Sequence, residues 1–381
     1  MNRDARILIS GAGIAGLTCA IWLGRSGFKP VVVEKAPRIR ADGFIISFSH
    51  HAYRFAQQLG LMPALRERDA GILSSSYHDR SGRALLTLDY ERLFAGVDVL
   101  QIMRDDLETV LFDNARDLAE FRFDTTATRI DQAKHRVDVT FSDGRQESFD
   151  LMIGSDGLHS ATRELAFDAT EINRQYLGLS CAAFRLPNFL RLRQKFETHM
   201  EASRYMVIFT SQDDDLTAVF VWASDMASAP PAEQRWRHLC EMYDGAADLV
   251  AKTLAHRPDE SMIYMDPLIQ IEMPSWHKRR VVVLGDAAHC LTLLSGQGAS
   301  AAFSDASRLS LALAEHEPED AFRIYENAMR PIITGLQPTT RRIARWYVPR
   351  SPLRHAARDA MLRYLPESAF RALFRYKYTK A

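Results

Sequence analysis

The segment Gly11-Ala12-Gly13-Ile14-Ala15-Gly16 restricts the fold of this chain more than any other feature of the sequence. It follows an apolar run from Arg6 to Ile9 and opens a helix-like segment, about Ile14 to Ser26, that Gly27 ends. A second apolar run, Val31 to Val33, completes a β-α-β unit. Glycines at this spacing permit a tight turn and let backbone N–H groups approach a pyrophosphate at the positive end of a helix dipole. The segment therefore predicts a dinucleotide-binding turn.

A carboxylate stands where the second strand of this unit ends. Glu34 lies about 20 residues beyond the glycines, where it can accept hydrogen bonds from both ribose hydroxyls of a dinucleotide. The predicted cofactor residues in this region are Gly11, Gly13, Ile14, Ala15, Gly16, Glu34 and Lys35. The fingerprint alone does not separate FAD from NAD, and a merely tight strand-helix turn would also use these glycines.

Two later motifs favour FAD by resemblance. The run from Asp156 to Arg163, DGLHSATR, resembles the DG motif of flavin-dependent aromatic hydroxylases, and the run from Gly285 to His289, GDAAH, resembles their GD motif. Both stand in the order of that family. The simpler interpretations are a turn in which Ser160 caps a short helix, and a strand end. Over nearly the whole chain the sequence resembles flavin monooxygenases of the para-hydroxybenzoate hydroxylase type, and among them the tetracycline-inactivating enzymes.

The resemblance implies roles for further residues. Arg40 and Arg104 match arginines near the FAD ribityl chain and phosphates, although each could also be a solvated arginine at a helix end. Asp286 matches a carboxylate that binds the ribityl or phosphate region. The remaining residues of the predicted cofactor site are Asp156, Gly285, Gly296, Gly298, Ala299 and Ser300. A helix beginning near Ser300 would stabilise the negative charge of a reduced flavin, and Ser300 could equally be an ordinary helix cap.

The chain departs from the family pattern at two positions. Leu293 stands where relatives usually have proline, and Ser300 stands where many have asparagine. Residues His50, Met206, Phe220 and Leu293 are candidate substrate contacts. The apolar strand residues among them could equally belong to the core, and a lone histidine is more often structural than catalytic.

The activity that this resemblance implies is FAD-dependent monooxygenation of a small aromatic or polycyclic molecule through a flavin hydroperoxide, with NADPH or NADH and O2 as co-substrates. No side chain is predicted as a catalytic acid, base or nucleophile, and no metal ligand is predicted. The alternatives are a flavin dehydrogenase or reductase on the same fold, and a flavin-fold protein that binds an aromatic ligand without turnover. Coupled oxygen consumption and ligand-stimulated NAD(P)H oxidation would separate the three.

The fold class expected is α/β, a Rossmann-type FAD-binding domain with an inserted antiparallel-sheet substrate domain and a C-terminal helical segment. The expected FAD-binding domain is discontinuous and comprises residues 1–72, 101–177 and 272–335. Residues 73–100 and 178–271 form the expected substrate domain, and residues 336–381 form a bridging helix or lid. The segment from Leu73 to Leu100 is more polar and is expected to be irregular.

Composition limits the surroundings of the protein. The apolar fraction is 47%, no run of about 20 apolar residues occurs, and membrane insertion is not expected. A strand-like run begins near the N-terminus without signal-peptide features, which favours a cytoplasmic protein. The four cysteines are scattered without paired spacing, so neither a zinc site nor a disulfide framework is predicted. The sequence leaves open whether the protein is a monomer or a homodimer.

The C-terminal tail is strongly basic. From Arg341 to Ala381 the sequence has eleven lysines and arginines against Asp359 and Glu367. Such a tail could bind nucleic acid or an anionic membrane. We favour instead a helix that packs on the acidic remainder of the chain, with no nucleic-acid partner. The expected apolar face of that helix is formed by Leu353, Ala356, Ala357, Ala360, Met361 and Tyr364.

Overall fold

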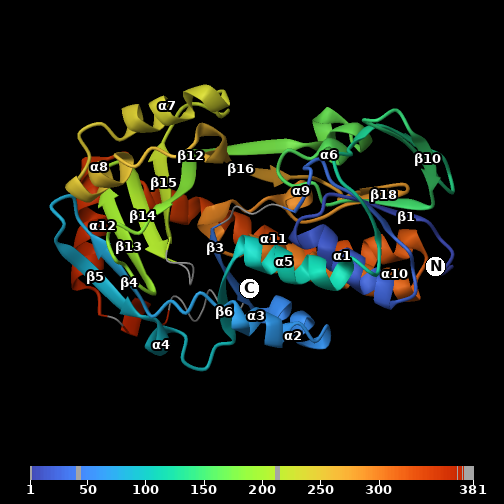
Figure 1. Ribbon diagram of the computed structural model, residues 1–381, viewed down its shortest axis with the longest axis horizontal. Helices are drawn as coiled ribbons and strands as arrows, with labels where there is room; N and C mark the ends of the chain where they lie inside the picture. The colour runs from blue at the N-terminus through green and yellow to red at the C-terminus, as the bar shows by residue number, and fades with distance from the viewer. Residues whose placement is uncertain (1, 40–43, 211–214, 367, 371, 373–381) are drawn as a thin grey trace. The chain divides into compact units, whose positions relative to one another are not determined.

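The computed structural model describes residues 2–39, 44–210, 215–366, 368–370 and 372. The chain divides into two compact units, each assembled from three chain segments (Figure 1). Unit 1 comprises residues 1–67, 104–175 and 269–338, and unit 2 comprises residues 68–103, 176–268 and 339–381. The α/β class expected from the sequence is confirmed, with a mostly parallel sheet in unit 1 and a mostly antiparallel sheet in unit 2.

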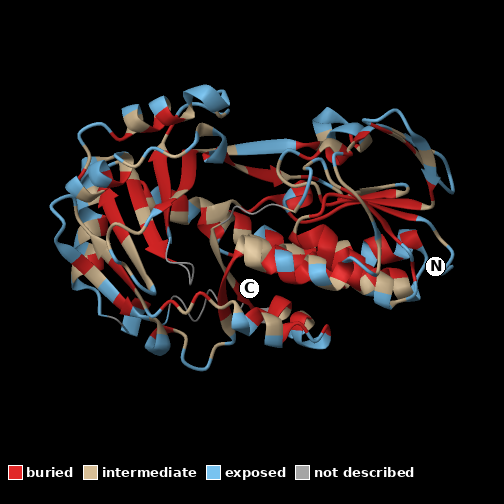
Figure 2. Cartoon of the chain, in the orientation of Figure 1, coloured by how far each residue is buried: buried red, intermediate tan, exposed pale blue. Residues whose placement is uncertain are grey.

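Unit 1 is built on a six-stranded sheet with strand order β17-β18-β11-β1-β2-β7. Its strands are parallel except β17, which pairs antiparallel with β18. Their bounds are β1 Ile7–Ser10, β2 Val31–Val33, β7 Glu120–Arg122, β11 Leu151–Gly154, β17 His277–Lys278 and β18 Val281–Val283. Every residue of β1, β2, β11 and β18 is buried, as continuous apolar runs predict for strands covered on both faces (Figure 2).

Helices cover one face of this sheet, and a small sheet covers the other (Figure 1). Helix α1, Ile14–Arg25, packs against α5, Arg104–Ala115, and α10, Gly298–Glu315, while α2, His50–Gln58, packs on α10. The small antiparallel sheet consists of β8 Ala127–Gln132, β9 Val137–Phe141 and β10 Gln146–Phe149. Other elements with residues in unit 1 are β3 Ile45–Ser49, α3 Met62–Glu67, α6 Ala161–Ala166, α9 Asp286–His289 and α11 Pro318–Tyr347.

Unit 2 is built on a seven-stranded sheet with order β16-β12-β15-β14-β13-β4-β5. The strands are β4 Ser74–His78, β5 Ala84–Asp89, β12 Asn173–Pro187, β13 Lys195–Glu201, β14 Arg204–Thr210, β15 Asp215–Ala223 and β16 Tyr264–Glu272. One face packs against α7, Arg235–Met242, and α8, Asp248–Leu254, through a large aromatic and aliphatic core. The unit also contains α4 Tyr90–Leu93, β6 Val99–Met103 and α12 Pro352–Tyr364.

The expectation of an irregular segment from Leu73 to Leu100 is wrong. Strands β4 and β5 form an antiparallel pair there, and β4 joins β13 in parallel. Strand propensity does not indicate a strand at the polar run Ser74-Ser75-Ser76, because the run is held by pairing with β5 and with β13, which lies about 120 residues away.

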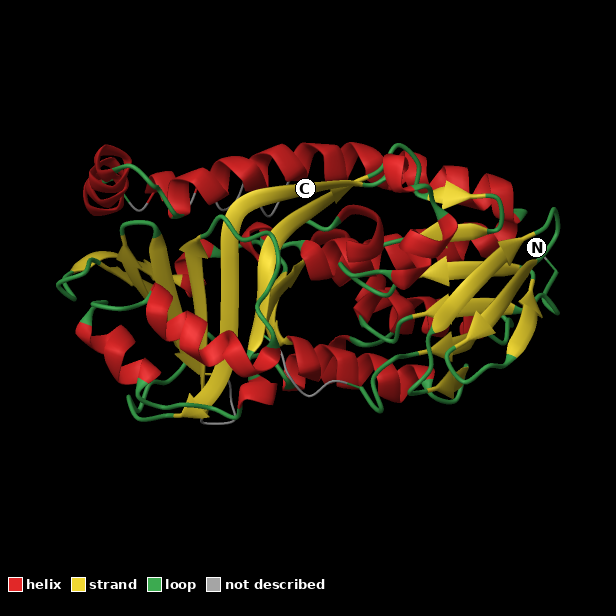
Figure 3. Cartoon of the chain, turned by 90° about the horizontal axis from the view of Figure 1, so that it is seen from above, coloured by secondary structure: helices red, strands yellow, loops and turns green. Residues whose placement is uncertain are grey.

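The tail is helical, but its expected apolar face is wrong. Helix α11 is 30 residues long and ends at Tyr347, and α12 follows it (Figure 3). Leu353 is 83% exposed and Tyr364 is 77% exposed, whereas the buried residues of α12 are Arg358 and Leu362. A buried arginine is a contact that a hydrophobic pattern cannot reveal. The predicted boundary at residues 335 and 336 falls inside α11, and the division of function among domains stays a prediction.

Candidate cofactor site

The glycine loop lies between β1 and α1, with Gly13 as the residue that caps the helix. Gly11 has a φ of +103°, and a Cβ there would lie 2.6 Å from the Ser155 carbonyl oxygen. A Cβ at Gly16 would lie 1.9 Å from the Gly11 carbonyl oxygen. At Gly13, by contrast, the nearest atoms to a Cβ are 3.8 Å away. Gly11 and Gly16 are therefore required by packing, and Gly13 leaves its backbone open to a ligand.

Glu34 meets this loop directly. Its Oε2 accepts a hydrogen bond from the Ala12 N–H at 2.9 Å, and its Oε1 accepts one from the Ala36 N–H at 2.9 Å. The sequence placed Glu34 at the end of β2, and the structure holds its carboxylate beside the loop. Ile14 and Ala15 are buried in the first turn of α1, and Lys35 is exposed next to Glu34.

Arg104 lies at the start of α5 and reaches the same loop. Its Nε donates to Glu108 Oε1 at 3.0 Å, and its terminal nitrogen lies 4.0 Å from the position of a Cβ on Gly13. The Glu108 side chain is 3% exposed and the Arg104 side chain is 40% exposed. Glu108 thus orients a half-exposed guanidinium toward the backbone that a pyrophosphate would approach. Arg40 lies outside the described residues.

Asp156 shapes the DG motif from within. One carboxylate oxygen accepts from the Ser160 hydroxyl, and the other accepts from the Thr162 N–H at 2.9 Å. The Ser160 hydroxyl in turn accepts from the Arg163 N–H at 3.0 Å, so the capping interpretation of Ser160 is confirmed. Asp156 therefore holds the turn through both of its carboxylate oxygens.

Arg163 links the two later motifs. It is 1% exposed, and burial lowers the pKa of its guanidinium, against the opposing effect of Glu164. It donates to the Leu158 carbonyl at 2.7 Å in the DG motif and to the Ala287 carbonyl at 2.9 Å in the GD motif. Ser155, just before the DG motif, donates to the Gly11 carbonyl at 3.0 Å. These bonds join all three motifs into one structure.

The GD motif forms a turn after β18 that glycine permits. Gly285 has a φ of +60°, and a Cβ there would lie 3.6 Å from Ala15 Cβ on α1 and 3.3 Å from Ala302 Cβ on α10. Its N–H donates to Asp305 Oδ2 at 2.9 Å, and Asp305 is completely buried. Asp286, the next residue, is exposed and begins α9. The turn therefore presents Asp286 beside the first turns of α1 and α10.

The start of α10 lies next to Asp286. A Cβ on Gly298 would lie 3.9 Å from Asp286 Oδ1. The helix is capped by Gln297, so the expectation that Ser300 might be its cap is wrong. The Ser300 hydroxyl instead donates to the Ser47 carbonyl and accepts from the Ser49 N–H, each at 3.2 Å. It thereby ties the last strand residues before α2 to α10.

The loop before α10 contains the other residues implied by the resemblance. Gly296 is exposed and left-handed, with a φ of +62°, and Ala299 is partly buried in the first turn of the helix. Leu293 begins a short 3-10 turn and is partly exposed. No acidic residue occupies the first turn of α10, so its positive end is uncompensated from within the helix.

These residues fit an extended FAD. Glu34 stands where a ribose would bind, and the open backbone at Gly13 with the Arg104 guanidinium suits the pyrophosphate. Asp286 can bind hydroxyls of the ribityl chain, and the positive end of α10 suits a flavin ring that becomes anionic on reduction. All of these groups belong to unit 1.

Two residues that support the site lie outside the motifs and escaped sequence reasoning. Asp305 accepts a hydrogen bond from the Gly285 N–H, and Glu108 accepts one from Arg104 Nε. Asp305 lies on the face of α10 that turns inward, and a charged residue within a run of small apolar residues was its only sequence signal.

Met206 and Phe220 lie in unit 2 on the sheet face that packs against α7 and α8. Each has no exposed surface and belongs to the aromatic core that includes Trp222, Trp236 and Tyr243. This geometry supports the core interpretation and gives neither side chain a surface for a substrate. His50 begins α2, and its side chain lies outside the described residues.

A partly buried titratable cluster also lies in unit 2. The His78 Nε2 is 2.5 Å from Glu197 Oε2, and the His78 and His199 rings stack with centroids 4.9 Å apart. The hydrogen bond with Glu197 raises the pKa of His78, whereas burial, and then the charge of His78, lowers the pKa of His199 to about 4. His199 is therefore neutral at neutral pH.

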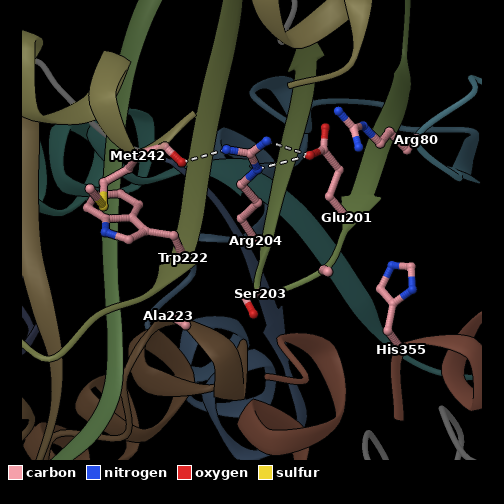
Figure 4. A pocket seen from close by; sticks show the side chains of 9 residues that line it. Arg80, Glu201, Ser203, Arg204, Trp222, Ala223, Met242 and His355 are labelled. Atoms are coloured by element: carbon pink, nitrogen blue, oxygen red, sulfur yellow. Dashed lines mark hydrogen bonds and ion pairs between the residues drawn. The ribbon is translucent and has the colours of Figure 1, made fainter. Parts of the chain in front are cut away.

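Unit 2 contains a pocket of about 450 Å³ at the turn that joins β13 and β14 (Figure 4). Glu201, Arg204, Trp222, Met242 and His355 are among its lining residues. Arg204 donates to the Met242 carbonyl at 2.7 Å and to Glu201 Oε2 at 2.9 Å. These charged groups attach the loop after α7 to the sheet, and no predicted site residue lines this pocket.

Comparison with known proteins identifies the family of the chain. The FAD binding domain family matches residues 4–333. A flavin-dependent monooxygenase from an unknown prokaryotic organism is 32% identical over 344 residues, covering 88% of each chain. A flavin-dependent monooxygenase of Legionella longbeachae is 30% identical over 344 residues, again covering 88% of each chain.

Solved structures share the fold. The tetracycline destructase Tet(51) superposes with a TM-score of 0.84 at 26% identity, covering 97% of this chain and 98% of that one. The HpxO protein of Klebsiella pneumoniae in complex with FAD and uric acid superposes with a TM-score of 0.84 at 23% identity, covering 98% of this chain and 96% of that one. No helix among the described residues is long and apolar enough to cross a membrane.

Proposed function

Since the chain belongs to the FAD binding domain family and is an FAD-dependent monooxygenase with NAD(P)H and O2 as co-substrates, we propose that unit 1 holds the flavin and that the enzyme hydroxylates a small aromatic or polycyclic compound. The observation that carries the first part is the joining of three motifs around Gly13, Gly285 and the start of α10. When bound, FAD supplies the electron transfer and the oxygen activation.

The protein's own part is binding and orientation. Arg104 offers a guanidinium at the open backbone of Gly13, and Glu34 offers two carboxylate oxygens beside the loop. Asp286 projects from a turn that Asp305 fixes from the buried side. No side chain of this set needs to act as an acid or a base for this role.

The proposed substrate class follows from two lines of support. The FAD-dependent monooxygenase relatives include the tetracycline destructases as structural neighbours, so polycyclic phenols such as tetracyclines are the first compounds to test. Leu293, at the usual proline position and partly exposed, offers an apolar contact near the start of α10. His50 stays a candidate on sequence grounds alone.

The experiment is a screen of purified, FAD-loaded enzyme for compounds that stimulate NAD(P)H oxidation. Products are then analysed by mass spectrometry after reaction under labelled O2. Incorporation of one labelled oxygen atom into a substrate supports the proposal. Stimulated NAD(P)H oxidation that proceeds equally without oxygen would instead indicate a flavin reductase. A cytoplasmic location is a further proposal, supported by the use of NAD(P)H and testable by cell fractionation. A monomer or a homodimer is also proposed, and light scattering tests it.

A further inference from the structure

One surface of unit 1 combines arginines with partly exposed aromatic rings. Trp22 on α1, Arg54 and Phe55 on α2, and Arg308 on α10 form this surface, which we call the arginine-aromatic patch. The Trp22 and Phe55 rings meet edge to face with centroids 6.3 Å apart, and the Arg308 guanidinium carbon lies 5.9 Å from the centre of the Phe55 ring. Arg54 is exposed, and the other three side chains are partly exposed.

The positive charge of the patch is not compensated. Within the part of the chain that the structure describes, neither Arg54 nor Arg308 forms an ion pair, and Arg308 Nε is buried without a hydrogen-bond partner. Helix α2 contains no acidic residue. Burial lowers the pKa of His51, and the positive charges of Arg308 and Arg54 lower it further. Two unpaired guanidinium groups beside aromatic rings favour an anion with a flat, apolar part.

We propose that the arginine-aromatic patch binds the phosphate-bearing adenosine half of NADPH or NADH. Guanidinium groups bind phosphates through paired N–H donors, and an adenine ring can stack on an aromatic side chain. The inference rests on the proposed function, because it assigns a docking surface to the reductant of the flavin.

The patch lies on the same two helices as the proposed flavin position. Ser49, just before α2, donates its N–H to the Ser300 hydroxyl on α10. Arg54 follows Ser49 by five residues, or about 7.5 Å along a helix, and Arg308 follows Ser300 by eight residues, or about 12 Å. An extended dinucleotide can therefore bind the patch through its adenosine half while its nicotinamide lies toward the start of α10.

The test compares two double variants of the FAD-loaded enzyme. The patch variant is Arg54→Gln with Arg308→Gln, and the control is Arg129→Gln with Arg136→Gln, which removes the same charge from exposed arginines of unit 1. Flavin reduction is followed without oxygen at increasing NADPH and NADH. We expect the half-saturating concentration to rise at least about tenfold in the patch variant only, as for the loss of one to two charged phosphate contacts. The limiting rate and the FAD content should not change.

A second measurement does not depend on turnover. Calorimetric titration of the oxidised holoenzyme with NADP⁺ should show binding to the wild type and at least about tenfold weaker binding to the patch variant. If the patch variant loses affinity only for NADPH and NADP⁺, the 2′-phosphate binds at the patch. If it loses affinity for NADH to the same extent, the pyrophosphate binds there. Either result supports the inference.

Three results would overturn it. They are equal half-saturating concentrations in the patch and control variants, binding of neither NADP⁺ nor NAD⁺ to the wild type, and a changed KM for the organic substrate alone. The last would assign the patch to an anionic substrate. Failure of the proposed function looks different, because the wild-type flavin would then be reduced by neither NADPH nor NADH.

Discussion

Asp305 and His289 form a fully buried contact in which Asp305 Oδ2 lies 2.7 Å from His289 Nε2. The same oxygen accepts the Gly285 N–H at 2.9 Å, so one carboxylate fixes both ends of the turn that presents Asp286. Asp305 is on α10 and the turn follows β18, so this contact joins the flavin-side helix to the parallel sheet.

The first prediction separates the two carboxylates at this turn. Asp305→Ala should lower the free energy of unfolding by about 3 kcal/mol, because it leaves the buried N–H groups of Gly285 and His289 without an acceptor. Asp286→Ala should leave unfolding within about 0.5 kcal/mol of wild type, because Asp286 is exposed, but should weaken FAD affinity. Urea denaturation of the apoprotein and FAD titration measure both. Similar unfolding energies in the two variants would contradict the role given to Asp305.

The second prediction concerns the glycine loop. Gly13→Val should fold but fail to bind FAD, because a side chain there meets protein atoms only at ordinary contact distance and occupies the approach to the backbone. Gly16→Val should fold poorly, because its Cβ would lie 1.9 Å from the Gly11 carbonyl oxygen. Circular dichroism and flavin absorbance after reconstitution distinguish the two. Normal FAD affinity in Gly13→Val would show that the pyrophosphate binds elsewhere.

The third prediction tests Arg104 as a cofactor-binding residue. Arg104→Ala should weaken FAD affinity by about 1 to 3 kcal/mol, the usual effect of losing a charge-assisted hydrogen bond, and saturating FAD should restore most of the turnover. Arg116→Ala, a substitution of an exposed arginine beyond the end of the same helix, is the matched control. Turnover near zero with the flavin site demonstrably full would give Arg104 a part in the reaction.

Local sequence patterns predicted the first elements of unit 1, because these elements depend on residues that lie close together in the sequence. The β-α-β unit of β1, α1 and β2 follows from apolar periodicity and glycine position. Strand β4 did not, because a serine run becomes a strand only through its distant partner β13. The apolar pattern of α12 misled for a related reason, since the buried face of this helix is organised around Arg358 and its carbonyl partners.

The sequence predicted the residues of the site that belong to recognisable motifs. The glycine loop, Glu34, Arg104 and Asp286 stand together in the structure, and whether each contacts FAD stays a prediction. The supports behind them were not predictable, because Asp305 becomes adjacent to Gly285 only when α10 packs against the sheet. The sequence left Met206 and Phe220 open between substrate contact and core, because it could not show that α7 and α8 cover their face of the sheet.

The fourth prediction is a pH dependence of stability in unit 2. The pKa of His199 falls from 6.5 to about 4 on folding. Between pH 6.5 and pH 4, His199 therefore binds a proton in the unfolded chain and stays neutral in the folded chain. The stability due to neutral His199 is complete above about pH 6.5 and is lost as the pH falls toward 4. At pH 5 the loss is about 2 kcal/mol, partly offset by His78, whose raised pKa acts in the opposite direction. Urea denaturation at pH 7 and pH 5 should show a smaller loss in His199→Gln than in wild type, and an equal loss would contradict the assignment.

The last prediction concerns α12 and the proposal that the tail is a substrate-side lid. Arg358 is 1% exposed and donates to the Tyr347 carbonyl at 2.9 Å, so Arg358→Ala should lower the free energy of unfolding by about 2 to 4 kcal/mol. Leu353→Ser with Tyr364→Ser should leave it within about 0.5 kcal/mol, because both side chains are largely exposed. If Leu353 and Tyr364 contact the substrate, this folded double variant should form less oxygenated product for each NAD(P)H that it oxidises. Two results together would assign the tail to nucleic acid instead. The ratio of oxygenated product to NAD(P)H oxidised would be unchanged, and the protein would show salt-dependent nucleic-acid binding that is lost when residues 351–381 are removed.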